Sequence, residues 1–294
     1  MSDSGDGWDS AVSAWAHAQG DIRALVQIGS RVQTSGNADS WSDYDYQLIS
    51  SHPEKYHDGS FAAGLGRCWA YGASLAFGNA VKVSAVFDGA LEADFVVLRH
   101  FEVVLATLAL RWPGTSGLWP RRLKSGVTNL RIVVGPGWKM IKGGNLWEKR
   151  YSRITPERPW LTEAEFRGKC GEFWTQLVWV AKKVERGEFR AGQRGFHEHL
   201  LENTFRILQE EARLEGRQSY PLARRAERWL TPEQIEATSG GTRPDRDALI
   251  AALRQVADMF SKSCAAVSTK TGWQTRDNAE VRAWLAGLFD EVRQ

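Results

Sequence analysis

Residues 28–49, IGSRVQTSGNADSWSDYDYQLI, constrain the fold and the chemistry of this chain more than any other segment. A short apolar segment ends in a Gly-Ser-Arg turn at residues 29–31, and after a polar loop Asp43 and Asp45 begin a second strand-like segment. Side chains two positions apart on a strand point to the same face, so these carboxylates are expected side by side. Neighbouring carboxylates repel each other unless a cation lies between them, and Mg²⁺ prefers oxygen ligands. Because a small-residue turn also offers backbone N–H groups to a polyphosphate, the segment indicates metal-dependent phosphoryl or nucleotidyl transfer.

A third carboxylate follows in a hairpin that we predict over residues 80–99. Alternating apolar residues flank the pair Asp88-Gly89, and an Asp-Gly pair between alternating runs is a strong hairpin signal. Asp94 lies on the return strand, and it can meet the first two carboxylates if all these strands join one sheet. Three carboxylates can hold two metal ions, which stabilise the attacking and leaving oxygens of an in-line displacement. Glu92 shares the strand face with Asp94 and is the alternative third carboxylate.

The first half of the chain is predicted to mix strands and helices. A helix is expected at residues 9–19, a strand at residues 21–28, a second strand at residues 43–49 and a helix at residues 101–112. The apolar segments 127–134 and 138–141 flank a Gly-Pro-Gly sequence and are predicted to form another hairpin.

The composition changes near residue 155, and the rest of the chain has helical patterns. The sequence TEAE at residues 162–165 is a capping box, in which Thr and Glu satisfy each other's backbone donors at a helix start. That helix is expected to end near residue 186, and further helical segments follow at residues 188–214, 221–229, 232–237, 244–269 and 278–292. We therefore predict an α+β chain: residues 1–155 form a mixed β-sheet with flanking helices, and residues 156–294 form an α-helical bundle.

The composition of the chain indicates which kind of ligand it binds and in which cellular compartment we expect it. The 294 residues are 43% hydrophobic and 25% charged, which is ordinary for a globular protein, and the net charge of +3 suits an anionic small ligand but not a nucleic-acid-binding protein. The three cysteines are far apart in sequence and form no CxxC pair, so we expect neither a zinc site nor a disulfide framework and infer a reducing cytoplasm. We expect no signal peptide, because the start of the chain is polar and acidic, and no membrane span.

The ordered motifs resemble the nucleotidyltransferases of the DNA polymerase β superfamily. In those proteins a Gly-Ser pair precedes an Asp-x-Asp pair by about a dozen residues, and a lone carboxylate follows on a later strand; here Ser30 and Asp43 are 43 − 30 = 13 positions apart. The aminoglycoside 6-adenylyltransferase family, which modifies streptomycin, is similar in three segments: GSRVQTSGNADSWSDYDYQLI, VFDGALEADFVVL and GEFWTQLVWVAKKVERGEFRAG. The resemblance covers residues 9–230, and it implies a nucleotidyltransferase domain followed by a helical domain that closes over substrate and nucleotide.

The resemblance also implies roles for individual residues. It implies a magnesium enzyme, with two ions, that takes ATP as its donor and transfers AMP to a small hydroxylated, cationic acceptor; we expect it to act as a monomer. Lys182 would reach the nucleotide phosphates from the helical domain, and Glu172 would meet the acceptor. The implied triphosphate-binding residues are Gly29, Ser30 and Arg31, and the implied metal ligands and catalytic carboxylates are Asp43, Asp45 and Asp94, of which Asp94 is alternatively the general base.

Other functions stay open at this point. Family members carry an acidic turn after the strand near residue 141, whereas this chain reads WKMIKGGNLW there, so the acceptor is not fixed by the resemblance. One alternative is a nucleotidyltransferase that modifies a protein hydroxyl, and another is a module that senses a nucleotide without transferring it. A resistance role against an aminoglycoside antibiotic is implied only if the acceptor is a drug of that class.

Overall fold

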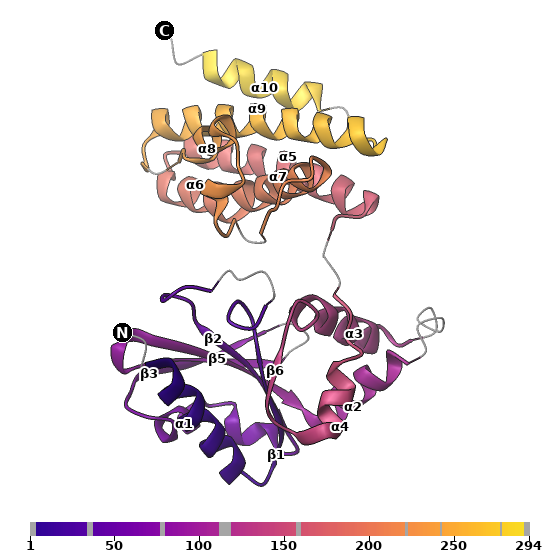
Figure 1. Ribbon diagram of the computed structural model, residues 1–294. Coiled ribbons are helices and arrows are strands. Elements are labelled where there is room, and N and C mark those ends of the chain that lie inside the picture. Colours follow the sequence, from indigo (N-terminus) through magenta and orange to yellow (C-terminus); the bar gives the residue numbers. More distant parts are fainter. Residues whose placement is uncertain are drawn as a thin grey trace. The chain divides into compact units, whose positions relative to one another are not determined.

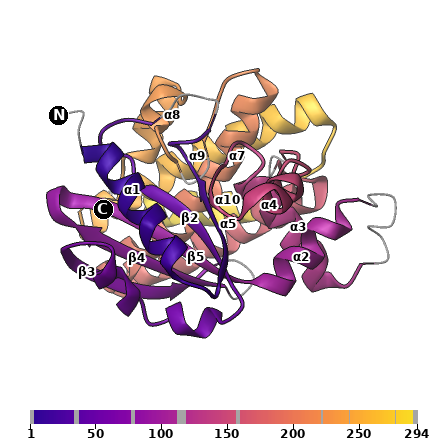
Figure 2. The same cartoon turned by 60° about the horizontal axis from the view of Figure 1, so that its bottom comes forward.

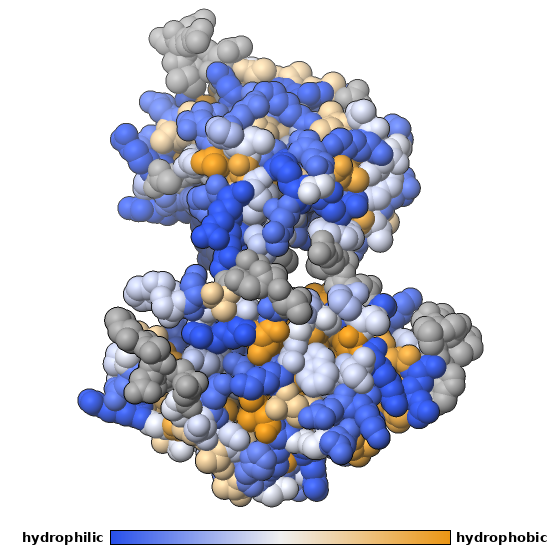
Figure 3. Space-filling model, viewed as in Figure 1, coloured by the Kyte–Doolittle hydropathy of each residue, from blue (hydrophilic) through white to orange (hydrophobic). Residues whose placement is uncertain are grey.

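The structure is a computed structural model, and it describes residues 4–33, 38–76, 80–111, 119–156, 160–220, 223–241, 243–276 and 278–290. The chain forms two compact units, residues 1–159 and 160–294. The sequence-based boundary lies at residue 155. On the face shown in Figure 3, hydrophilic residues cover most of each unit, with small hydrophobic areas between them. None of the helices in the described ranges combines the length and the hydrophobicity that crossing a membrane requires.

The first unit is built on a six-stranded mixed sheet with strand order β3-β4-β5-β2-β1-β6 (Figure 1). Strands β2 and β5 pair in parallel, and the other neighbours are antiparallel. The strands are β1 (Ile22–Ile28), β2 (Tyr44–Ser50), β3 (Cys68–Leu75), β4 (Val81–Phe87), β5 (Leu91–Arg99) and β6 (Lys139–Lys142). The helices are α1 (Ser4–Ala18), α2 (His100–Ala109), α3 (Arg121–Val133) and α4 (Gly144–Tyr151), with short 3₁₀ turns at Pro53–Tyr56 and Ser60–Gly64.

Each face of this sheet is covered by different helices, because side chains alternate along the strands. Helix α1 lies across one face (Figure 2) and buries Trp8, Val12 and Ala16 against that side of the sheet. Helices α2, α3 and α4 pack on the other face, where Val26 and Ile49 join their apolar side chains. The two hydrophobic clusters hold the sheet between helical layers, which is the α+β arrangement that the sequence predicted.

The predicted hairpin over residues 80–99 is confirmed. Strands β4 and β5 are antiparallel and pair Ser84 with Asp94 and Phe87 with Leu91. The turn at Asp88–Ala90 places Gly89 at φ 77°, a left-handed backbone conformation that glycine adopts at little cost.

The predicted hairpin over residues 127–134 and 138–141 is wrong. Residues 127–133 belong to α3, which buries Val127 and Leu130, and Val134 follows directly. The spacing of these three residues, three and then four positions, is that of one helix face, whereas on a strand Val127 and Leu130 would point to opposite faces. The second segment is a strand, β6, but it pairs with β1.

The second unit is helical, and the predicted capping box at its start is confirmed. The Thr162 side chain accepts a hydrogen bond from the Glu165 backbone N–H, and the Glu165 carboxylate accepts one from the Thr162 N–H at 2.8 Å. The helices are α5 (Glu163–Glu185), α6 (Phe189–Gly195), a π-helical segment (Phe196–Leu201), α7 (Glu202–Leu214), α8 (Pro232–Thr238), α9 (Arg246–Thr271) and α10 (Ala279–Asp290).

Packing between α5 and α9 forms the centre of this unit. Phe173 and Phe260 stack with their ring centroids 3.7 Å apart, and both side chains are fully buried. The helix predicted over residues 221–229 is wrong for its described part, which contains one short 3₁₀ turn, Ala226–Arg228. Ala223 and Arg225 have positive φ angles of 53° and 52°, and this left-handed backbone interrupts a right-handed helix.

A partly buried carboxylate just before β1, that of Asp21, is expected to make the stability of the first unit depend on pH. Asp21 accepts hydrogen bonds from Ser50 Oγ and Tyr56 Oη, each at 2.9 Å, and Lys55 lies 3.7 Å away. Burial acts to raise the pKa of Asp21, but these hydrogen bonds outweigh it and lower the pKa below its ordinary value of 3.8. The ionised form is therefore the one that the folded chain stabilises.

We expect Asp21→Asn to lower the free energy of unfolding by about 1 to 2 kcal/mol at pH 7, because it replaces charge-assisted hydrogen bonds by neutral ones. A depressed folded-state pKa contributes stability above the unfolded-state pKa, and this contribution is lost as the pH falls through the folded-state pKa. Urea denaturation of wild type and variant should therefore show a gap that is full at pH 6 to 7 and closes below about pH 4. Asp88→Asn, at an exposed carboxylate of the same unit, is the control. A gap of constant size down to pH 3 would contradict this assignment.

Candidate active site at the ends of β1, β2 and β5

The turn after β1 brings backbone and side chains close to the carboxylates. Gly29 has φ 80°, and a Cβ atom at this position would lie 2.1 Å from Asp45 Oδ2, so only glycine fits here without moving the carboxylate. The Gly29 carbonyl accepts hydrogen bonds from the N–H groups of Val32 and Gln33, each at 3.2 Å, which closes the turn. Ser30 Oγ is buried and has no hydrogen-bond partner within the described part of the chain.

The three predicted carboxylates come together because of strand register. Asp45 on β2 and Asp94 on β5 are directly paired residues of neighbouring parallel strands. Asp43 lies two positions before Asp45 and therefore points to the same face. One ligand oxygen from each of the three residues lies within 4.8 Å of the other two, and all three side chains are partly buried. The cluster contains Asp94 rather than Glu92, which was the alternative third carboxylate.

This cluster stands where the helices stop covering the sheet. Farther along the same face of β2, Gln47 is buried and accepts a hydrogen bond from the Tyr151 hydroxyl of α4 at 2.7 Å, and Ile49 joins the apolar cluster under α2–α4. One face of β2 therefore changes from carboxylate to amide to hydrocarbon in steps of two residues. The apolar part anchors the strand, and the carboxylates extend beyond it.

Arg31, a predicted triphosphate-binding residue, holds the segment that leads into β2. Its Nη2 and Nε atoms donate to the Ser42 carbonyl at 2.6 and 3.0 Å, and Nε also lies 3.2 Å from the Asp43 carbonyl. The guanidinium stacks on the Tyr44 ring at 3.9 Å from its centroid, a cation–π contact. These contacts fix the backbone on which Asp43 and Asp45 stand.

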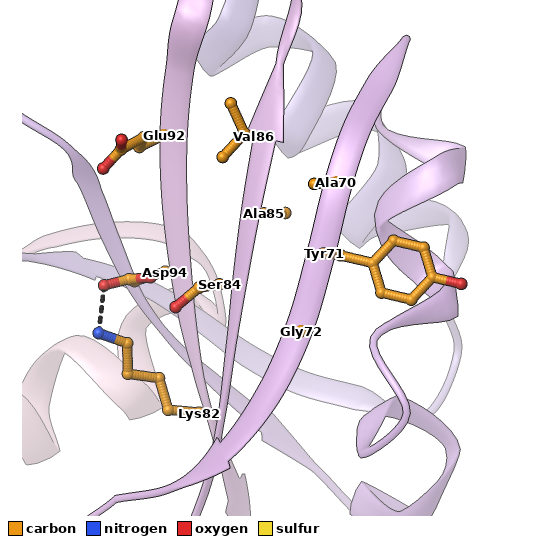
Figure 4. A pocket seen from close by; sticks show the side chains of 9 residues that line it. All are labelled: Ala70, Tyr71, Gly72, Lys82, Ser84, Ala85, Val86, Glu92 and Asp94. Atoms are coloured by element: carbon orange, nitrogen blue, oxygen red, sulfur yellow. Dashed lines mark ion pairs between the residues drawn. The ribbon is translucent and has the colours of Figure 1, made fainter.

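A lysine that the sequence did not single out faces the carboxylates from β4. Lys82 Nζ lies 2.5 Å from Asp94 Oδ2 (Figure 4). The hydrogen bond to Asp94 is the main cause that raises the pKa of Lys82, burial opposes it, and the charges of Asp45 and Asp43 add to the rise. The hairpin register contained the signal for this residue, because pairing Ser84 with Asp94 places Lys82 one step along the same face.

A shallow hollow of about 340 Å³ opens beside Asp94 on the same face of β3, β4 and β5. Its floor consists of small residues, since Ala70, Gly72 and Ser84 supply little side-chain volume there. Glu92 and Lys82 project at its sides, whereas the Tyr71 ring points away from it (Figure 4). A small ligand in this hollow would lie next to the Asp94 carboxylate.

The cluster fits a hard divalent cation. Three carboxylate groups with converging oxygens provide the ligand type that Mg²⁺ takes, and they leave room for phosphate oxygens and water. The unpartnered Ser30 hydroxyl adds a polar group that a phosphate oxygen would satisfy.

Two further predicted site residues belong to the second unit. Lys182 and Glu172 are both exposed on α5. Glu172 accepts a hydrogen bond from Lys169 at 2.9 Å, an exposed pair one helical turn apart. Their nucleotide-binding and acceptor-binding roles stay predictions.

A Gly-Ser turn after β1, an Asp-x-Asp pair at the start of β2 and a third Asp on the parallel neighbour β5 form the arrangement that the resemblance to polymerase β-type nucleotidyltransferases implies. The chain is similar in structure to an aminoglycoside 6-adenyltransferase from Bacillus subtilis, with 14% sequence identity, coverage of 96% of both chains and a TM-score of 0.44. It is also similar to a nucleotidyltransferase-like protein from Exiguobacterium sibiricum 255-15, with 9% identity, coverage of 90% of this chain and 77% of that chain, and a TM-score of 0.36. No protein-family model and no curated protein sequence matches the chain.

Proposed function

We propose that this chain is a Mg²⁺-dependent nucleotidyltransferase that transfers AMP from ATP to a hydroxyl group of a small acceptor and releases pyrophosphate. The observation that carries the proposal is the convergence of Asp43, Asp45 and Asp94 beside the Gly29-Ser30 turn. Carboxylates held this close attract cations, and a phosphate-binding turn at the same place suits a metal-bound nucleotide.

Each residue of the site is proposed to have its own role in the reaction. The acceptor oxygen forms a bond to the α-phosphorus of ATP, and the bond from that phosphorus to the oxygen bridging to the β-phosphate breaks. Asp94, next to the hollow, would accept the proton of the acceptor hydroxyl. Asp43 and Asp45, with Asp94 as the third carboxylate, would hold the metal, which supplies charge stabilisation to the phosphate oxygens when it is bound. Gly29 and Ser30 would orient the triphosphate, and Arg31 would keep Asp43 in place through the backbone.

The carboxylates around the hollow support a proposal for the acceptor class, although Lys82 also lines the hollow. Glu92 and Asp94 provide carboxylates at the hollow, and these would attract a cationic group of an acceptor. We propose a small hydroxylated acceptor that carries amino groups, as aminoglycosides do. Lys182 and Glu172 are proposed to contribute contacts to the phosphates and to the acceptor from α5.

Pyrophosphate release by the purified 294-residue chain tests this function. With Mg²⁺, ATP and a panel of aminoglycosides and other amino sugars, at least one acceptor should release pyrophosphate and gain the mass of AMP. A cell extract incubated with labelled ATP separates the alternatives: label on a protein would support modification of a protein hydroxyl. Tight Mg-ATP binding without turnover on any acceptor would support a nucleotide sensor and contradict the proposal.

A further inference from the structure

Lys82 places an ammonium group where a cation is needed. Its Nζ atom contacts Asp94 at 2.5 Å, and the negative charges of Asp43 and Asp45 act on it as well. The Lys82 side chain is 38% exposed, whereas that of Asp94 is 17% exposed, so the carboxylate is the fixed partner and the lysine approaches it from the solvent side. An ammonium on a flexible four-carbon stem is a point charge that can leave its partner.

We propose that Lys82 is the resident counter-ion of the three carboxylates and that a divalent cation must displace it from Asp94 in order to bind. This inference rests on the proposed metal site. Two cations on one carboxylate repel each other, so part of the attraction that a metal gains from Asp94 is offset by the loss of the ion pair with Lys82. The lysine therefore weakens binding of the metal alone and reduces the repulsion among the carboxylates in its absence.

The position of Lys82 also keeps the displaced ammonium near the bound nucleotide. Lys82 stands on β4 across from Val96, and its stem lines the hollow beside Asp94 (Figure 4). Once released, the ammonium stays close to the cluster, where the anionic phosphates of a metal-nucleotide complex would attract it. A metal that arrives with a triphosphate thus loses less by displacing Lys82 than a metal that arrives alone, so Lys82 favours joint binding of metal and nucleotide.

Metal binding without nucleotide tests this idea directly. Mn²⁺, a spectroscopic substitute for Mg²⁺, can be titrated into the 294-residue chain while electron paramagnetic resonance measures the free ion. Lys82→Met removes the charge and keeps the length of the stem, and we expect it to bind Mn²⁺ about tenfold more tightly, a change of about 1.4 kcal/mol. Water screens the part-exposed ion pair, which keeps the gain near this size.

Two further variants separate charge from structure. Lys82→Arg keeps a cation beside Asp94 and should bind Mn²⁺ within about twofold of wild type. Lys55→Met is the matched control, because Lys55 pairs with Asp21 at 3.7 Å beyond the opposite end of β1, and it should leave Mn²⁺ affinity unchanged. ATP should also tighten the binding of Mn²⁺ to the protein, and this effect should be smaller in Lys82→Met than in wild type.

The outcomes distinguish this inference from the proposed function. Equal Mn²⁺ affinity in wild type and Lys82→Met, or weaker affinity in the variant with an unchanged melting temperature, would overturn the counter-ion role while leaving the metal site intact. Asp45→Asn reports on the site itself and should abolish binding in both backgrounds. If none of these proteins binds Mn²⁺, both the metal site and the counter-ion role fail.

Discussion

Replacing Asp45 by Asn is expected to reduce nucleotidyl transfer at least about a thousandfold, which corresponds to roughly 4 kcal/mol of transition-state stabilisation. Asp45 is the central carboxylate, since Asp43 shares its strand face and Asp94 is its partner across the parallel pair. An amide in this place keeps the shape but removes one of the negative charges that hold a divalent ion. The expected loss is large because charge stabilisation by a bound metal supplies several kcal/mol in reactions of this kind.

The same substitution should leave the fold intact. Asp45 pairs with Ile28 and Asp94 through its backbone, and these ladders do not depend on the side chain. We expect the melting temperature to stay within about 3 °C of wild type or to rise, because removing a charge relieves repulsion inside the cluster. Pyrophosphate release measures the activity, and circular dichroism measures the melting temperature.

A control is needed for the loss of one negative charge from this unit. Asp58→Asn changes an exposed acid whose carboxylate accepts a hydrogen bond from the Ser60 backbone N–H at 3.0 Å, and it should retain full activity. Chelation of divalent ions should bring wild type down to the level of Asp45→Asn. A variant that keeps more than a tenth of wild-type turnover would refute the metal role of Asp45.

The members of the carboxylate cluster could be predicted from the sequence because local rules place each of them on its strand. Asp43 and Asp45 share a face by strand periodicity, and the Asp-Gly turn fixes the strand that carries Asp94. What local rules do not determine is that β2 and β5 are parallel neighbours, an arrangement that depends on the order of strands in the whole sheet. The assumption of one common sheet supplied this step, and the register of Asp45 against Asp94 bears it out.

Contacts between distant segments explain what sequence analysis missed. Residues 127–134 are rich in branched apolar residues, which favour a strand, but Val127, Leu130 and Val134 are buried against the sheet at helical spacing. The Sγ atoms of Cys170 and Cys264 lie 3.4 Å apart as free thiols, although 94 positions separate them, because α5 and α9 pack together in the second unit. Neither spacing nor composition predicts a neighbour of this kind.

Gly29→Ala is expected to reduce turnover at least about a hundredfold, through the position of Asp45 rather than through the fold. An added Cβ would stand 2.1 Å from Asp45 Oδ2 and 2.9 Å from its Cγ, so the carboxylate must rotate away from the cluster. The left-handed backbone at φ 80° adds a cost of about 1 to 2 kcal/mol to the stability of the variant. Both activity and Mn²⁺ affinity should fall, and they should fall together.

Gly89→Ala separates these two effects. Gly89 has φ 77°, close to that of Gly29, but a Cβ atom there would meet no atom within 4 Å. The two variants should therefore lose similar amounts of stability in urea denaturation, while only Gly29→Ala loses metal binding and turnover. Equal losses of activity in both variants would show that backbone strain, and not contact with the Asp45 carboxylate, causes the loss in Gly29→Ala. Retained Mn²⁺ affinity in Gly29→Ala would mean that Asp45 can move without cost, and the close approach of the turn to the cluster would then have no part in the site.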